Sequence, residues 1–129
     1  MAKEIKTEKL LTDLELEIMQ AVWDLAPCTV RAIVSRLSTH RPLAYTSVAT
    51  MMKILEQKHA VKSEKQDSVH LYNPIIKRKD YENRALKHLT EKIFKATPSS
   101  VVMRLLDETK ISKEELAEIK KTLNERLKT

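Results

Sequence analysis

The side chains best suited to chemistry in this sequence are a group of short hydroxyl residues and one lysine near its centre. Thr46, Thr50 and Lys53 follow one another at intervals of four and three residues, which places them on one face of a helix, with Ser47 and Ala49 nearby. Hydroxyl groups can hydrogen-bond to base edges or phosphates, an alanine methyl group can meet that of thymine, and lysine can reach guanine. These five residues are therefore candidates for reading DNA bases. Hydroxyl residues also suit a helix N-terminus or a solvent-facing surface, which is the alternative.

Basic residues surround this group. From Cys28 to Lys62 the sequence holds six basic residues and a single acidic one, Glu56, and the whole chain carries a net charge of +6. Five basic side chains are candidates for phosphate contacts, which set affinity and register rather than sequence preference: Arg31, Arg36, Arg41, Lys62 and Lys65. The pattern favours double-stranded DNA as the partner, and a merely solvated basic surface is the alternative.

The sequence offers little for catalysis or metal binding. It contains no glycine, which excludes the glycine-rich phosphate-binding loops and the nucleophile elbow. Its one cysteine, Cys28, excludes a disulfide within the chain and a zinc site built on cysteine pairs. The four histidines, His40, His59, His70 and His88, fall on separate segments without metal-ligand spacing. We expect no enzymatic activity, no metal and no cofactor.

The composition indicates a helical protein of the cytoplasm. Of the 129 residues, 42% are apolar but only 4% are aromatic, so the core must be built from aliphatic side chains, which favours helices packed on helices. No apolar run approaches the roughly 20 residues needed to cross a bilayer. The charged N-terminus lacks the pattern of a signal peptide. We therefore expect a cytoplasmic protein without membrane contact.

Three helices are predicted in the first part of the chain. Thr12 and Glu15 have the spacing of a capping box and begin a helix that Pro27 ends. Thr29 is suited to cap a short second helix, and apolar spacing predicts a third helix over about 47–58.

A β-hairpin is predicted to follow the third helix. Two short alternating segments, 61–65 and 69–72, flank a polar turn. The order of helix, helix, helix and hairpin is typical of a winged helix-turn-helix. A small α+β domain whose hairpin only covers the core is the alternative.

The last part of the chain is predicted to form three more helices. They run over 77–96, from Thr97 and from Ser112, and each has an apolar stripe too small to form a core of its own. We expect dimerisation through six of these side chains: Val102, Leu105, Leu106, Leu116, Ile119 and Leu123. Packing back onto the N-terminal part is the alternative. The chain is accordingly divided into a winged-helix DNA-binding domain, 1–76, and a helical dimerisation domain, 77–129.

Four segments form a combination that is specific although none is decisive singly: 11–15 (LTDLE), 44–50 (AYTSVAT), 55–58 (LEQK) and 71–74 (LYNP). Together they resemble the penicillinase-repressor family, the BlaI/MecI/CopY group of winged-helix regulators, and the similarity runs from about residue 11 to residue 127. The resemblance implies a homodimeric repressor that binds a palindromic operator, with the C-terminal helices as the dimer interface. It also places the base-reading positions at Thr46, Ser47, Ala49 and Thr50.

The chain departs from the family pattern at several positions. His59 stands where the family usually has glycine after the third helix, so a histidine must take the conformation that ends a helix. Ile54 replaces a common arginine. Arg104 and Leu105 stand where the β-lactam-responsive branch has the Asn–Phe bond that is cleaved on induction, and the paired C-terminal cysteines of the copper-responsive branch are absent. The inducing partner, a sensor or a protease, is therefore left unidentified by the resemblance.

A second class of function is compatible with the same elements. A winged helix can be the scaffold of a protein-interaction module that docks a partner through its C-terminal helices. The basic residues around the third helix favour DNA. Equal affinity for random and operator DNA would favour the interaction module.

Overall fold

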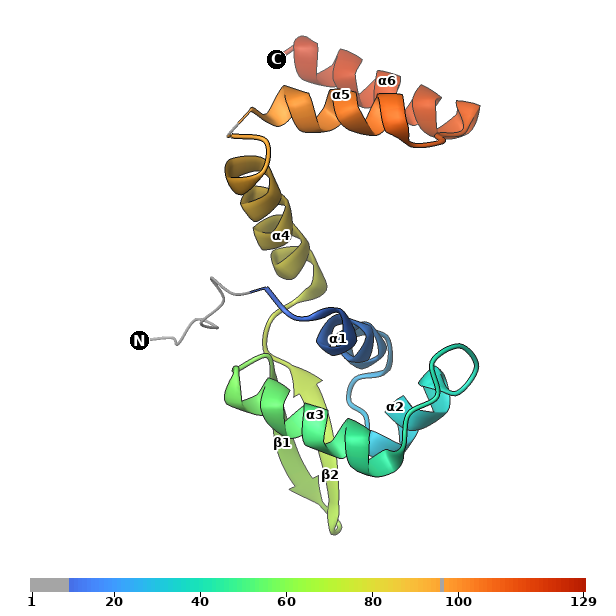
Figure 1. Ribbon diagram of the computed structural model, residues 1–129, viewed down its shortest axis with the longest axis vertical. Coiled ribbons are helices and arrows are strands. Elements are labelled where there is room, and N and C mark those ends of the chain that lie inside the picture. Colours follow the sequence, from blue (N-terminus) through green and yellow to red (C-terminus); the bar gives the residue numbers. More distant parts are fainter. Residues whose placement is uncertain (1–9, 96) are drawn as a thin grey trace. The chain divides into compact units, whose positions relative to one another are not determined.

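In residues 10–95 and 97–129, the part of the chain that the computed structural model describes, three helices and a hairpin come first and three helices follow (Figure 1). The first elements are α1 (Asp13–Leu25), α2 (Val30–Leu37), α3 (Tyr45–Gln57), β1 (Val61–Gln66) and β2 (Val69–Pro74). They are followed by α4 (Arg78–Lys92), α5 (Pro98–Glu108) and α6 (Lys113–Leu127). This order confirms the predicted fold class, a mostly helical winged helix-turn-helix with further C-terminal helices.

Side-chain caps set the starts of the first two helices. The Thr12 hydroxyl accepts from the Glu15 amide at 3.2 Å, and the Glu15 carboxylate accepts from the Thr12 amide at 2.9 Å, so the predicted capping box is confirmed. Thr29 caps α2 by accepting from the Ala32 amide at 3.1 Å. Helix α3 begins at Tyr45, two residues before the predicted start, after an N-cap residue whose side chain makes no capping hydrogen bond.

Helix α3 ends in a left-handed residue. His59 has a φ of 63°, its amide donates to the Glu56 carbonyl at 3.0 Å, and the Ala60 amide donates to the Leu55 carbonyl at 2.9 Å. These two hydrogen bonds form a Schellman motif, in which glycine is the usual left-handed residue. The conformation expected at His59 is therefore confirmed.

The wing is an antiparallel hairpin whose register runs from Val61 opposite Pro74 to Gln66 opposite Val69. Its turn consists of Asp67 and Ser68, with φ values of 52° and 67°. Positive φ at both central residues is required in a two-residue type I′ turn, whose backbone twist matches that of the two strands.

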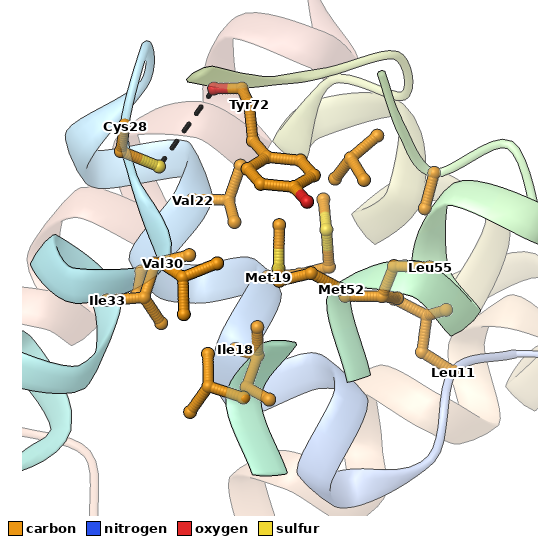
Figure 2. Packing of buried hydrophobic residues seen from close by; sticks show 14 of the residues in the cluster. Leu11, Ile18, Met19, Val22, Cys28, Val30, Ile33, Met52, Leu55 and Tyr72 are labelled. Carbon is orange, nitrogen blue, oxygen red and sulfur yellow. Dashed lines mark hydrogen bonds between the residues drawn. The ribbon is translucent and has the colours of Figure 1, made fainter. Parts of the chain in front are cut away.

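The core of the first unit joins all of these elements. Its fully buried side chains come from the three helices and β1: Ile18, Met19, Val22, Ile33, Val48, Met52, Leu55 and Val61. Figure 2 shows the Tyr72 ring of β2 lying over this cluster, near Met19 and Met52. Cys28 joins the hairpin edge, because its amide donates to the Tyr72 carbonyl at 3.1 Å and its carbonyl accepts from the Tyr72 amide at 2.7 Å. Burial raises the pKa of the Cys28 thiol, which keeps it protonated and unreactive and is consistent with a structural role.

The first unit extends into α4. The packing separates one unit that ends at Ala85 from a second that comprises Leu86–Thr129. Tyr81 accepts from the Leu11 amide at 3.0 Å, and its ring centroid lies 5.9 Å from that of Trp23. The first turns of α4 contact α1 and therefore pack with the first unit. The division expected between residues 76 and 77 stays a prediction.

The second unit exposes its apolar side chains. The predicted capping box of α6 is present, since the Ser112 hydroxyl accepts from the Glu115 amide at 3.0 Å and the Glu115 carboxylate accepts from the Ser112 amide at 3.1 Å. Most large apolar residues of α5 and α6 face solvent, and Val101 is a buried exception. No helix within the described residues is long and apolar enough to span a membrane.

Candidate nucleic-acid interface

Helix α3 presents a polar stripe on the side that faces away from the core. Thr46, Thr50 and Lys53 are exposed, whereas Met52 and Leu55 on the opposite side are fully buried. The burial of one side by α1 and the hairpin fixes which residues of α3 face outward. Three of the five candidate base-reading residues therefore share one accessible face of a regular helix.

The other two candidates lie on either flank of that stripe. Ala49 is half-buried and lines a cleft between α3 and the hairpin. Ser47 is exposed, and helical spacing places it on the flank away from Ala49. The five residues thus cover a wide arc around the N-terminal part of α3.

The cleft beside α3 has a volume of about 630 Å³. Its lining comes from α2 and the residue before it, from α3, and from the hairpin: Thr29, Val30, Arg31, Tyr45, Ala49, Lys53, Glu56, Ser63, Ser68, Val69, His70 and Tyr72. The Arg31 guanidinium carbon lies 5.9 Å from the centroid of the Tyr45 ring, a cation–π contact at the cleft wall. The Ser63 hydroxyl donates to the Glu56 carboxylate at 2.9 Å and so links β1 to α3.

Sequence reasoning did not assign Tyr45, Ser63 or His70 to this surface. Tyr45 precedes Ala49 by one helical turn, a spacing that would have placed it on the same flank of α3. Alternation along the hairpin places Ser63, His70 and Tyr72 on one face, and the burial of Val61 and Tyr72 shows that this face is turned toward α3. Burial, with the nearby Glu56 and Tyr45, raises the pKa of Tyr72, so its hydroxyl stays neutral.

The five candidate phosphate contacts fall into two groups. Arg31, Lys62 and Lys65 are exposed, and no carboxylate of the described residues forms an ion pair with them. Arg36 and Arg41 are also exposed, but both form ion pairs with acidic residues of α1.

The acidic residues of α1 neutralise part of the basic surface. The Arg36 guanidinium lies 2.9 Å from the Asp24 carboxylate, and that of Arg41 lies 3.1 Å from Glu17. Asp24 also accepts from Arg78 of α4 at 2.7 Å. The hydrogen bond from Arg78, together with Arg36, outweighs desolvation and holds the pKa of Asp24 below its usual value. Arg31, Lys53 and the two lysines of the wing thus form no ion pair within the described residues, and the wing also carries Glu64 and Asp67.

The described residues offer no alternative metal chemistry. No group of three or more His, Cys, Asp or Glu side chains in them is placed to hold a metal ion. The surface beside α3 combines hydroxyl groups and cations, which are groups that contact DNA bases and phosphates, with the rings of Tyr45 and Tyr72.

A family model described as the penicillinase repressor matches residues 11–125. The chain belongs to the penicillinase-repressor family. The match includes all of the first unit from Leu11 onward and nearly all of the second.

Individual members of the penicillinase-repressor family show how the similarity is distributed. The penicillinase repressor of Bacillus licheniformis is 26% identical over 115 residues, which cover 89% of this chain and 90% of that protein. The transcriptional regulator BlaI of Mycobacterium tuberculosis is 39% identical over 66 residues, about half of each chain. The solution structure of Bacillus licheniformis BlaI, solved as a monomeric form with the blaP half-operator, superposes with a TM-score of 0.50 at 28% identity. The superposed region covers 62% of this chain and 94% of the solved BlaI chain.

Members of the penicillinase-repressor family are transcriptional repressors and not enzymes. This chain is accordingly a DNA-binding transcriptional repressor.

Proposed function

We propose that this repressor binds as a homodimer to an operator with dyad symmetry, and that each protomer inserts α3 into the major groove. The observation that carries the proposal is the exposed stripe of Thr46, Thr50 and Lys53, with Arg31 of α2 lining the adjoining cleft. Recognition helices present such an N-terminal stripe to base edges. The protein acts where its DNA lies, in the cytoplasm.

Sequence preference comes from the N-terminal part of α3. Thr46 and Thr50 hydrogen-bond to base edges, and Lys53 reaches a guanine or a phosphate. Ser47 and Ala49 contribute from the two flanks, where the Ala49 methyl group suits a thymine methyl group. These contacts discriminate between sequences, so their loss changes the preferred bases.

Affinity comes from contacts to phosphates. Arg31, Lys62 and Lys65 neutralise phosphates directly, since no carboxylate of the described residues forms an ion pair with them. Arg36 and Arg41 also lie on the basic side, but each brings a carboxylate of α1 with it. The guanidinium groups of both ion pairs have further N–H donors, which orient the DNA backbone through hydrogen bonds to its phosphates. Because their charge is already offset by a carboxylate, they contribute little to counterion release.

The apolar faces of α5 and α6 bind a second copy of this chain. Val102, Leu105 and Leu106 of α5 are exposed by 47%, 52% and 36%. On α6, Leu116 and Leu123 are exposed by 42% and 53%, and Ile119 is half-buried. The half-operator bound by monomeric Bacillus licheniformis BlaI supports a second copy as the occupant, because a half-site implies a second half-site. If the protein does not dimerise through these faces, they fit the alternative function, in which α5 and α6 dock a different protein.

Binding measurements on the full chain test this function. A duplex recovered by the protein from a random-sequence library should bind about a thousandfold or more tightly than a scrambled duplex at near-physiological salt. Equal, salt-sensitive affinity for both duplexes would overturn specific recognition and favour the interaction module. The mass of the DNA-free protein in solution reports separately on the dimer.

Induction by cleavage of an Asn–Phe bond does not apply at this position, because Arg104 and Leu105 of α5 stand there. A sensor that binds the repressor, or a protease that cuts elsewhere, is compatible with this arrangement.

A further inference from the structure

The cleft between α3 and the hairpin brings Arg31 and His70, which lie outside the base-reading stripe, together with Lys53, which belongs to it. We propose that this cleft is a binding subsite for one phosphate of the DNA backbone. Arg31 and Lys53 hold the phosphate from the helical wall, and His70 holds it from the hairpin wall. The inference rests on the proposed DNA binding and adds to it a contact whose strength depends on protonation.

The helical wall is built to present positive charge. Arg31, at the start of α2, is positioned against the Tyr45 ring, with 5.9 Å between the guanidinium carbon and the ring centroid. Lys53 lies on α3 two turns after Tyr45, and both line the cleft. Stacking against an aromatic ring limits the rotamers of an arginine, so less entropy is lost when it binds a phosphate.

The hairpin wall places an imidazole opposite these cations. His70 pairs with Lys65 across the hairpin, and Tyr72 pairs with Ser63, so all four side chains lie on one face. That face is turned toward α3, because Tyr72 is buried in the core and Ser63 donates to Glu56. His70 itself is exposed and lines the cleft.

The charges that face His70 favour a bound anion. Lys65 lies across the hairpin from it, Arg31 and Lys53 line the helical wall, and Glu56 is the only carboxylate in the lining. Glu56 already accepts from the Ser63 hydroxyl. A phosphate between the walls offsets the repulsion among these cations and favours the imidazolium form, which has two N–H donors. DNA binding therefore takes up a proton, and affinity falls as the pH rises.

The test compares operator binding by the full chain at about pH 6 and about pH 8, the interval in which histidine changes charge. The probe is a duplex that the wild-type protein selects from a random-sequence library, with affinity read by fluorescence anisotropy at constant ionic strength. We expect the wild type to bind about three- to tenfold more tightly at the lower pH. His70→Gln should lose this difference, because the glutamine amide carries no charge at either pH. His88→Gln, an exposed position of α4 outside the cleft, should keep it.

Several outcomes would overturn the subsite. A pH difference that survives in His70→Gln, or one that His88→Gln also removes, assigns the proton to another group. Movement of the His70 ring resonance on addition of inorganic phosphate alone, with normal DNA binding by His70→Gln, assigns the cleft to a free anion. A wild type that selects no duplex refutes the proposed function itself, whereas a wild type with pH-independent operator affinity refutes only the subsite.

Discussion

The Lys58 ammonium group, at the end of α3, donates to both carboxylate oxygens of Glu15 in the first turn of α1. The distances from Nζ are 2.8 Å to Oε1 and 2.7 Å to Oε2. Glu15 is buried and also accepts from the Thr12 amide, whereas the Lys58 side chain remains 36% exposed. The pair therefore fixes the C-terminal end of α3, the helix with the candidate base-reading residues, against α1, the first helix of the fold.

Removal of the cation should destabilise the first unit. Burial tends to raise the pKa of Glu15, but the hydrogen bonds from Lys58 and Thr12 outweigh it and hold that pKa below its ordinary value. Lys58→Met leaves a buried carboxylate without its cation, and we expect a loss of about 2 kcal/mol in the free energy of unfolding. Urea denaturation monitored by the fluorescence of Trp23, the single tryptophan, measures it in the unit that contains the pair.

The same pair should make stability depend on acid pH. Because the folded-state pKa of Glu15 is lowered, its contribution is present above the unfolded pKa of about 4.3 and is lost as pH falls through the folded value. Glu15→Gln should flatten this part of the stability–pH curve. A wild-type curve and a Glu15→Gln curve of the same slope below about pH 5 would exclude this role.

His59 carries a conformational cost that glycine would remove. Its φ of 63° is unfavourable for a residue with a Cβ atom, so His59→Gly should stabilise the first unit by about 1 kcal/mol. His59→Ala is the matched control, because it removes the imidazole but keeps the Cβ atom. Chemical denaturation of both variants should show a gain for glycine alone, and an equal gain for alanine would assign the effect to the ring.

The salt dependence of operator binding should separate free cations from paired ones. Lys53→Ala should reduce the slope of log affinity against log salt by about 0.9, the value for one phosphate contact. Arg36→Ala should reduce it by less, since the charge of Arg36 is already offset by Asp24. A larger reduction in Arg36→Ala than in Lys53→Ala would contradict this division of the basic surface.

The proposed dimer should depend on the apolar face of α5. Leu105 is 52% exposed in the single chain, and Leu105→Lys should weaken dimerisation by about tenfold or more because it places a charge in an apolar contact. Asp107→Lys introduces the same side chain on the opposite face of α5 and should leave dimerisation intact. Sedimentation equilibrium measures both, and equal behaviour of the two variants would remove α5 from the interface.

Local signals in the sequence predicted most of the elements of the fold. The capping oxygens of Thr12, Thr29 and Ser112 each act on a backbone amide three residues later, so the chain itself specifies these helix starts. The start of α3 was placed two residues late because its N-cap, Ala44, has no side-chain oxygen to mark it. The left-handed His59 followed from its place after the helix, which the family resemblance marked.

Contacts between distant segments were beyond such signals. Tyr81 reaches the Leu11 amide across 70 residues, and nothing local to either residue marks that hydrogen bond. The ion pairs of Arg36 and Arg41 with α1 likewise depend on how α2 and the connection after it pack against α1. Predicting the cleft would have required both the hairpin register and the burial of Tyr72. His70, which lines the cleft, was therefore given no role from the sequence.

The most direct measurement is a parallel selection of duplexes from a random-sequence library by the wild type and by Thr50→Ala at near-physiological salt. We expect the wild type to select a dyad whose half-sites lie roughly 34 Å apart, one turn of DNA. Thr50→Ala should select a dyad of the same spacing with altered preference at one symmetric pair of positions. Identical sequences from both proteins, or no enrichment by the wild type, would contradict base reading by the exposed stripe of α3.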